Sequence, residues 1–180
     1  KFEEQRKKKI LNRFLILVRK LSSGRKYSEN STIKVREIQY RYQLKKQKNF
    51  FYCCLLFSKF LNLSKFFKKI FNYLEKLYLN TEYFDSLLNF HKPDAVLIGS
   101  CCIDHDAYIS VSAKKLHIKL ASIIYSWDNP STKGFAICKP DKVFSWNQAM
   151  SRDIENFFEI DKNSITECGI LHWSNYKDKI

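Results

Sequence analysis

The amino-acid sequence predicts an α/β fold, because apolar strand-like runs alternate with helical patterns beyond Pro93. The runs lie at residues 94–99, 120–125, 143–146 and 165–168. They are apolar throughout rather than at every second residue, which favours a parallel sheet covered on both faces. We therefore expect a Rossmann-like parallel sheet with flanking helices, preceded by basic amphipathic helices.

Helical spacing fills the gaps between the predicted strands. Asp104 and Asn147 are each able to cap the start of a helix. The first helix would carry Ala107, Tyr108, Val111 and Leu116, and the second Met150, Ile154, Phe157 and Phe158. Residues 126–141 carry no periodic pattern, and a gap of 16 residues is uncommon in a compact domain unless the loop has a task.

The N-terminal part is predicted to be helical. Residues 2–21 place an apolar stripe opposite basic side chains, which indicates a basic amphipathic helix facing either a core or an anionic membrane. Residues 22–49 fit neither period well, and we treat them as a variable connection with some helix. A wide apolar helix face is predicted for residues 64–78, and a short helix follows until Pro93 ends it. The apolar run 50–57 is far shorter than the roughly 20 residues of a membrane span.

Charge is divided unevenly along the chain. Residues 1–76 contain 21 Lys and Arg and 5 Asp and Glu, a balance of +16, whereas residues 77–180 contain 11 and 13, a balance of −2. This concentration of positive charge in the N-terminal part suggests an acidic partner, either an anionic membrane or a polyphosphate backbone. A plain solvated helical surface is the competing interpretation.

The chain of 180 residues would hold a basic helical region over residues 1–80 and a Rossmann-like domain over residues 81–175. It begins with Lys1 and ends in a polar run, so we expect a fragment. The six cysteines match neither zinc spacing nor a disulfide framework, and free, buried, cytosolic thiols are the simplest interpretation. We expect no secretory signal, because the opening residues carry acids and a lysine run without an apolar core. We expect a cytoplasmic protein without a metal site.

The candidate site follows the second predicted strand, at the edge where α/β proteins bind ligands. Asp128 would act as a general base, because the neighbouring Trp127 reduces its solvation and raises its pKa. Trp127 also offers a flat face to a sugar or lipid, and Lys133 would neutralise an anion. Further binding contacts are expected from Asn129, Ser131, Thr132 and Gly134.

Two other strand ends contribute candidates. His105 is a second acid or base beside Asp104, and Asn147 follows the third strand. The competing interpretations are structural: Asp128 and Asn129 form a turn that Pro130 continues, and His105 is only the neighbour of a helix cap.

Glycine signatures for phosphate binding are absent from the sequence. No Gly-rich dinucleotide turn follows the first strand, and there is no Walker-type loop. A nucleotide used by this protein would therefore be bound elsewhere.

Three motifs resemble the N-terminal half of bacterial GT-B-type glycosyltransferase-like proteins of surface polysaccharide synthesis. They are Lys92-Pro93-Asp94 before a strand, Ser126-Trp127-Asp128-Asn129 with Thr132-Lys133-Gly134, and Pro140-Asp141 before a strand that closes on Trp146-Asn147. The likeness covers about residues 84–175 and extends to the closing Glu167-Cys168-Gly169. The loop is also distantly similar to the Trp-His-Gly motif of CDP-glycerol glycerophosphotransferases, where the histidine would align with Asp128. Pro130 stands where the closer family commonly has leucine.

The resemblance implies an acceptor-binding half that works with a C-terminal domain holding the nucleotide-sugar donor. It implies no cofactor in this half, a glycan or lipid-linked acceptor, and Asp128 as the base. The basic helix 1–21 would then hold the enzyme peripherally on the inner face of the cytoplasmic membrane.

Two alternatives come from other classes of protein. A nucleic-acid-associated basic protein would need aromatic side chains interleaved with Lys and Arg on one exposed face. The phenylalanines between residues 50 and 78 instead follow the spacing of a helical core, so nucleic acid is the weaker expectation. A sugar-nucleotide epimerase-like domain would need catalytic carboxylates and histidines that this half does not clearly show.

Overall fold

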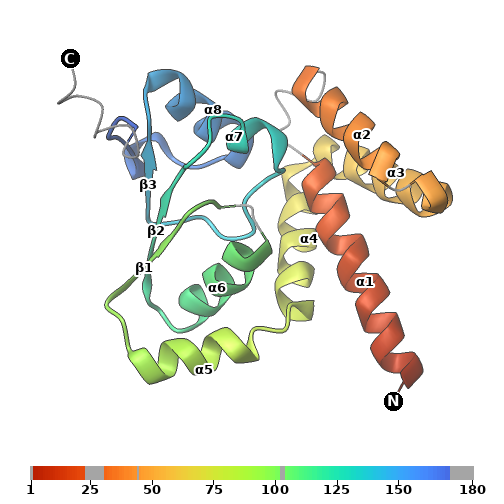
Figure 1. Cartoon of the computed structure of the whole chain (residues 1–180), viewed down its shortest axis with the longest axis horizontal. Helices are drawn as coiled ribbons and strands as arrows, with labels where there is room; N and C mark the ends of the chain where they lie inside the picture. Colours follow the sequence, from red (N-terminus) through yellow and green to blue (C-terminus); the bar gives the residue numbers. More distant parts are fainter. Residues whose placement is uncertain (1, 23–30, 44, 102–103, 171–180) are drawn as a thin grey trace, which may run out of the picture.

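The structure is a computed structural model that describes residues 2–22, 31–43, 45–101 and 104–170 (Figure 1). Helices come first along the chain, and a parallel sheet follows. The helices before the sheet are α1 (Phe2–Leu21), α2 (Ser31–Gln43), α3 (Lys48–Leu63), α4 (Lys65–Tyr78) and α5 (Glu82–His91), with the short 3-10 turn η2 (Lys45–Gln47) before α3.

The sheet has four parallel strands in the order β1-β2-β3-β4. The strands are β1 (Ala95–Ile98), β2 (Lys119–Ile123), β3 (Lys142–Ser145) and β4 (Ile165–Glu167). The segments between them contain α6 (Asp104–Lys115), α7 (Asn129–Thr132), α8 (Gln148–Phe158) and the 3-10 turn η3 (Lys162–Ser164). The predicted α/β fold is confirmed, and each predicted strand is found within two residues of its expected ends.

The sequence predicted a sheet covered on both faces, and this prediction is wrong, because one face of the sheet is largely open. The buried face carries Val96, Ile98, Leu120 and Val143, whereas Leu97 on the other face is 60% exposed. Ala121, Ile123 and Phe144, on the same face as Leu97, are only half-buried. Strands added in sequence order by right-handed crossovers place their connecting helices on one face, and Figure 1 shows α6, α7 and α8 on the same side of the strands.

The N-terminal helices pack on one another and on the connection between β2 and β3. The apolar side of α1, at Leu15, Val18 and Leu21, is buried against α3 and α4. Phe135, from the connection between β2 and β3, belongs to the same cluster. The core-facing alternative for this helix is therefore confirmed over residues 15–21. The division of the chain near residue 80 stays a prediction.

A buried ion pair joins α1 to α4. Nε of Arg19 donates to Oε1 of Glu75 over 2.8 Å, and neither side chain is more than 1% exposed. Nη1 of Arg19 also donates to the backbone oxygen of Phe135 over 3.4 Å. Buried charges are tolerated only when they are paired and hydrogen-bonded, so these contacts fix how α4 is turned on α1.

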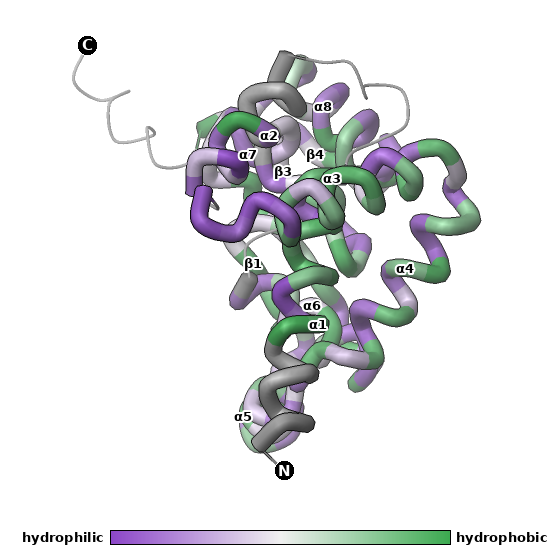
Figure 2. Tube along the Cα trace, turned by 90° about the vertical axis from the view of Figure 1, so that its right-hand side faces the viewer, coloured by the Kyte–Doolittle hydropathy of each residue, from purple (hydrophilic) through white to green (hydrophobic). Residues whose placement is uncertain are grey.

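A second ion pair attaches α4 to the end of α8. Nζ of Lys68, which is itself buried, lies 3.1 Å from Oε1 of Glu159. The same ammonium group lies 5.9 Å from the centre of the Phe135 ring. Figure 2 shows α4 along the edge of the molecule, with hydrophilic and hydrophobic turns alternating along its length. No helix in the described ranges is both long and apolar enough to cross a membrane.

Removing one partner of the Arg19–Glu75 pair should cost more stability than removing both. We expect Glu75→Leu to lower the free energy of unfolding by about 3–5 kcal/mol, because Arg19 keeps its charge in a buried site. The double variant Arg19→Met/Glu75→Leu should recover most of that loss. Urea unfolding of both variants measures the difference, and a double variant no more stable than Glu75→Leu would contradict the role given to the pair.

Candidate functional site

The carboxyl ends of the strands meet at one edge of the sheet, and the loops after β1 and β2 touch there. A Cβ atom added to Gly99, directly after β1, would lie 3.6 Å from Cδ1 of Tyr125, which follows β2. The Tyr125 ring therefore lies beside the first loop and is half exposed. This edge is the usual ligand site of an open parallel sheet.

Asp128 lies in the loop after β2 and is half-buried. The hydroxyl of Ser126 donates a hydrogen bond to Oδ1 of Asp128. A donor two residues away in the same tight loop holds the carboxylate in a fixed orientation. The arrangement suits a group that must accept a proton at a fixed place.

The loop continues directly into α7, so the structural interpretation of this segment is also correct. Asp128 precedes the first residue of α7, and Pro130 occupies the first turn, where its missing N–H costs nothing. Oγ of Ser131 donates to the backbone oxygen of Asp128 over 3.2 Å. Turn formation and proton transfer are compatible, because the backbone of Asp128 makes the turn and its carboxylate bonds to Ser126.

The predicted binding residues around Asp128 differ in exposure. Trp127 is 72% exposed, so its ring offers a face to a ligand. Asn129 is buried, and its Nδ2 has no acceptor among the described residues. Lys133 is half-buried and ends α7 with a backbone bond to Asn129. Thr132 is the last residue of α7, and its side chain lies outside the described residues.

Gly134 is needed for packing. Its φ is +86°, and an added Cβ would lie 2.4 Å from the backbone oxygen of Arg19 and 2.8 Å from Cα of Lys20. Only glycine adopts this conformation freely and lets two backbones approach so closely. The loop that carries Asp128 is therefore attached to the end of α1. A direct role for Gly134 in substrate binding stays a prediction.

The other predicted residues lie on neighbouring strand ends. His105 is exposed in the first turn of α6, after β1. Asn147 caps α8, since its Oδ1 accepts from the backbone N–H of Met150 over 3.0 Å. Asp104 is the first residue of α6, and its side chain lies outside the described residues. Substrate roles for these three residues stay predictions.

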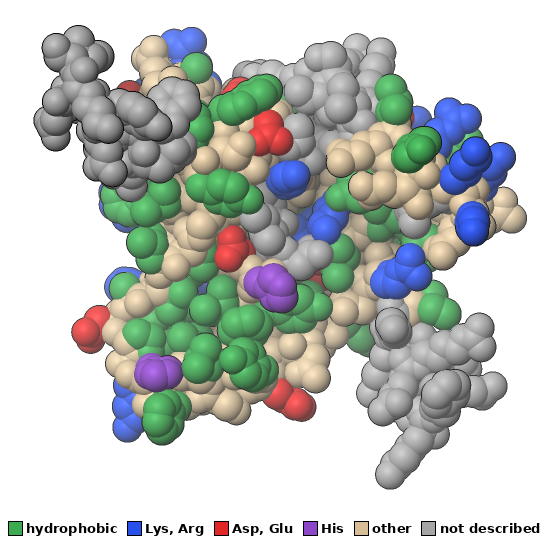
Figure 3. All heavy atoms as spheres, in the orientation of Figure 1, with side chains coloured by type: hydrophobic (Ala, Val, Ile, Leu, Met, Phe, Trp, Pro, Cys, Tyr) green, Lys and Arg blue, Asp and Glu red, His purple; other side chains and the backbone are tan. Residues whose placement is uncertain are grey.

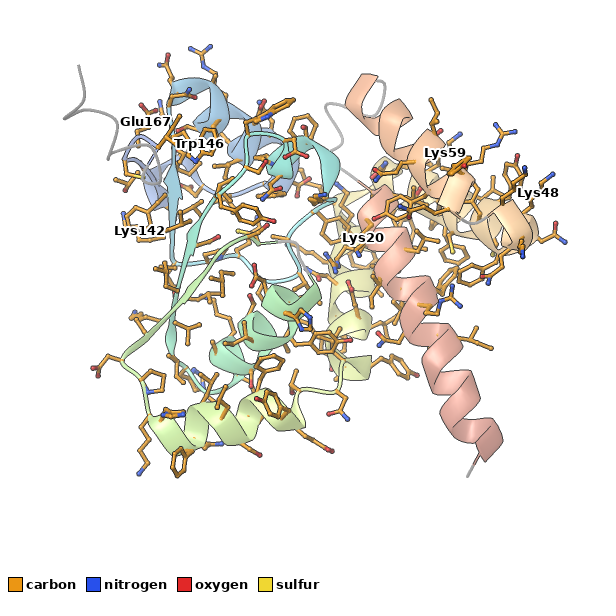
Figure 4. All side chains as sticks on the ribbon, viewed as in Figure 1. Lys20, Lys48, Lys59, Lys142, Trp146 and Glu167 are labelled. Atoms are coloured by element: carbon orange, nitrogen blue, oxygen red, sulfur yellow. The ribbon has the colours of Figure 1, made fainter. Side chains whose placement is uncertain are left out.

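Two carboxylates at this edge were missed by the sequence reasoning. Burial raises the pKa of Asp106, although the backbone N–H of Ser100 and the nearby His105 oppose the rise. Glu167, at the end of β4, accepts from Oγ of Ser151 over 3.1 Å, and Figure 4 shows it beside Trp146. Asp106 could have been found from the sequence, because it follows the first strand and is adjacent to the candidate His105.

Asp141 of the Pro140-Asp141 motif has a structural task instead. Its carboxylate accepts from Nζ of Lys114 over 2.7 Å and from the backbone N–H of Leu120 over 2.8 Å. These two bonds lower the pKa of Asp141. The residue thereby connects the end of α6, the start of β2 and the start of β3.

A cavity of about 660 Å³ lies away from this edge. Its lining includes Pro140, Asp161 and Ser164, which precede β3 and β4 and so mark the amino ends of the strands. We place the site at the carboxyl edge, because strand ends and a loop with oriented polar groups coincide there. In the part of the chain that the structure describes, no group of three His, Cys, Asp or Glu side chains could hold a metal ion.

The cysteines are only partly as expected. The described ones are free, and Cys54, Cys101 and Cys138 are buried. Cys53 and Cys168 are exposed, so the prediction of uniformly buried thiols is wrong. Cys53 is exposed because it lies on the outer side of α3. Burial raises the pKa of Cys54 to about 12, so this thiol stays protonated.

Gly134→Ala should destabilise the protein more than Gly169→Ala. Both glycines have positive φ, which costs an alanine about 1–2 kcal/mol. A Cβ at position 169 would meet nothing within 4 Å, whereas one at position 134 meets the backbone of α1. Thermal unfolding of the two variants isolates that contact, and equal losses would show that the loop does not need it.

Asp106→Asn and Asp141→Asn should change stability in opposite directions at about pH 7. The raised pKa of Asp106 means that folding favours its neutral form, so its ionisation lowers stability as the pH rises above 3.8. Asp106→Asn removes that loss and should stabilise the protein. The lowered pKa of Asp141 means that its carboxylate adds stability above pH 3.8, which disappears as the pH falls through the folded value.

Urea unfolding between about pH 4 and about pH 7 measures both effects. The gain from Asp106→Asn should increase as the pH rises from 3.8 to the folded pKa of Asp106 and should be constant above it. Asp141→Asn should cost on the order of 1 kcal/mol near neutrality, because the carboxylate is partly exposed and its bonds are screened. Two variants with the same sign would contradict these assignments.

Comparison with known proteins found no match. No protein-family model, no curated protein and no solved structure matches the chain. Any assignment of function therefore depends on the residues of the site and on the sequence motifs.

Proposed function

We propose that this chain is the acceptor-binding part of a glycosyltransferase-like enzyme of cell-surface polysaccharide or glycolipid synthesis. Asp128 would be its base, taking the proton from an acceptor hydroxyl while that oxygen attacks the anomeric carbon of the nucleotide-sugar and the bond from that carbon to the nucleotide breaks, which releases the nucleotide. The observation that carries the proposal is the Ser126–Asp128 hydrogen bond, in a loop at the carboxyl end of β2. The motifs shared with the GT-B-type proteins support the same assignment.

Trp127 gives the proposed acceptor a place to bind. Its ring is largely exposed beside Asp128, and a flat apolar face of this kind packs well on the apolar side of a sugar ring. Asn129 contributes the unpartnered amide hydrogens described above. The nucleotide-sugar donor would bind to a separate domain, since the sequence lacks glycine signatures for phosphate. Acceptors linked to lipid would bring the enzyme to the inner face of the cytoplasmic membrane.

Asp128→Asn should abolish turnover by the full-length enzyme and leave its fold intact. The amide cannot take the acceptor proton, and the loss of a general base typically costs about 10²–10⁴-fold in rate. Asp94→Asn is a suitable control, because Asp94 is exposed next to the first residue of β1, at the opposite end of that strand. Sugar transfer and circular dichroism are measured on both variants, and near-normal transfer by Asp128→Asn would refute the base assignment.

Trp127→Ala should weaken the binding of a polyprenyl-linked oligosaccharide by this chain, because it removes the proposed contact face. Tyr83→Ala is a matched control, since Tyr83 is also 72% exposed but lies on α5. Neither change should affect folding. Acceptor affinity is measured by titration calorimetry without donor, and equal affinities for the two variants would contradict the proposed acceptor site.

A further inference from the structure

Helix α4 is turned opposite to the usual orientation of an amphipathic helix. Its buried residues are Lys68, Phe71 and Glu75, two of which are charged. Its apolar stripe is exposed instead, with Phe66, Tyr73 and Leu77 each more than 60% accessible to solvent. An amphipathic helix of a globular protein normally directs that stripe to the core. The ion pairs of Lys68 and Glu75 explain the orientation, because they hold the polar side inward.

The exposed stripe continues from α4 onto α3. Helix α3 buries Phe51, Cys54, Ser58 and Leu61 and leaves a second apolar row outside. Ser64 alone separates the two helices, and the rings of Phe60 and Phe67 lie 4.6 Å apart across the corner. We call this surface the α3–α4 apolar face, defined by Tyr52, Leu56, Phe60, Leu63, Phe66, Phe67, Ile70, Tyr73 and Leu77.

On α3 and α4 themselves, the exposed charged side chains beside the α3–α4 apolar face are all positive. Between residues 38 and 81 the one acidic residue is Glu75, which is buried against Arg19. The exposed cations on the two helices are Lys48, Lys59, Lys65 and Lys69. Figure 3 shows blue side chains gathered over the N-terminal helices, and Figure 4 shows Lys48 and Lys59 on the side away from the sheet.

A groove adjoins the start of α3. It has a volume of about 310 Å³ and lies between α2 and α3. Ile38, Tyr42 and Tyr52 give it an apolar wall, and Arg41, Lys45 and Lys48 supply positive charge. Apolar surface and cations therefore occur together here as well.

We propose that the α3–α4 apolar face docks the protein onto the surface of an anionic lipid bilayer. Apolar side chains would enter the boundary between headgroups and acyl chains, while the lysines reach the anionic headgroups. Docking of a second copy is disfavoured, because the exposed lysines of α3 and α4 on the two copies would repel each other. The face does carry exposed aromatic rings beside lysines, which a nucleic-acid surface would need, but Leu56, Leu63, Ile70 and Leu77 favour lipid, since base stacking gains little from aliphatic side chains.

This surface differs from the one that the sequence suggested for membrane contact. Over residues 15–21 the apolar stripe of α1 is used for the core, whereas α3 and α4 leave theirs outside. The phenylalanines between residues 50 and 78 were expected in a core, yet Phe57, Phe60, Phe66 and Phe67 are exposed. The inference depends on these helices alone and not on the proposed transferase activity.

Vesicle sedimentation of the full chain tests the proposal without any substrate. The protein should bind vesicles of phosphatidylglycerol and phosphatidylcholine. The triple variant Leu56→Ser/Phe66→Ser/Leu77→Ser should partition roughly a hundredfold more weakly, because each apolar side chain that enters the interface contributes on the order of severalfold to tenfold. These three residues are exposed, so their replacement leaves the core intact, and thermal unfolding verifies this.

A matched triple variant lies outside the α3–α4 apolar face. Tyr83→Ser/Phe90→Ser/Leu97→Ser removes side chains that are 72%, 82% and 60% exposed, close to or above the exposure of the first set. It should bind vesicles like the unchanged protein. Equal weakening by both triple variants, or failure of the unchanged protein to bind, would overturn the proposal and leave the acceptor site at Asp128 untouched.

A charge comparison tests the lysines separately. Lys65→Gln/Lys69→Gln should weaken binding to anionic vesicles by about fivefold per lysine, whereas Lys119→Gln/Lys162→Gln, also at exposed positions, should have little effect. Neither pair should alter binding to pure phosphatidylcholine. A single-stranded oligonucleotide is the competing probe. If the Leu56/Phe66/Leu77 variant loses oligonucleotide binding but keeps vesicle binding, the face binds nucleic acid and the membrane proposal is refuted.

Discussion

The buried Arg19–Glu75 ion pair is the contact on which the arrangement of the N-terminal helices depends. It connects α1 to α4 in a site where neither charge reaches water, and the same guanidinium donates to the backbone of Phe135 between β2 and β3. Apolar packing alone would allow α4 to rotate, because hydrophobic attraction has no direction. A charge that must find its partner in a dry site selects one rotation. The position of three separate segments is thereby fixed by one side chain.

The rotation of α4 that the ion pair selects determines which side chains of this helix face solvent. Lys68 and Glu75 occupy the inward side of α4, so the apolar stripe of the same helix faces solvent. If a folded core were the only demand on α4, burial of Phe66, Tyr73 and Leu77 would have released more free energy than burial of two charged groups. The exposed stripe is therefore better explained by a role outside the core. Helices that combine an exposed apolar stripe with lysines as their only exposed charges have the composition of helices that lie on anionic membranes.

Local patterns in the sequence were sufficient to predict the strands, because four short apolar runs bounded by Pro, Gly and Asp fit strands better than helices. The capping of α8 by Asn147 was also visible, since a side-chain cap acts within three residues. The orientation of α4 could not be predicted, because periodicity reveals a stripe but not the side that it faces. That orientation depends on Arg19, which is 56 positions away from Glu75. The open face of the sheet was missed for a related reason: an apolar strand indicates two faces suited to burial, while the crossovers decide which one is covered.

The candidate site is connected to this arrangement through its own loop. Gly134 lies against the backbone of Arg19, and Arg19 in turn binds Glu75 on the inner side of the helix whose outer side is the docking face. These contacts connect the loop of Asp128 to the helix that carries the proposed membrane surface. Because each of them is buried and tightly packed, a protein lying on a bilayer through α3 and α4 would hold Asp128 and Trp127 at a fixed orientation to that bilayer. If the proposed acceptor is linked to lipid, it would approach from the same surface, so the packing that turns α4 outward would also define the direction from which the acceptor meets the base.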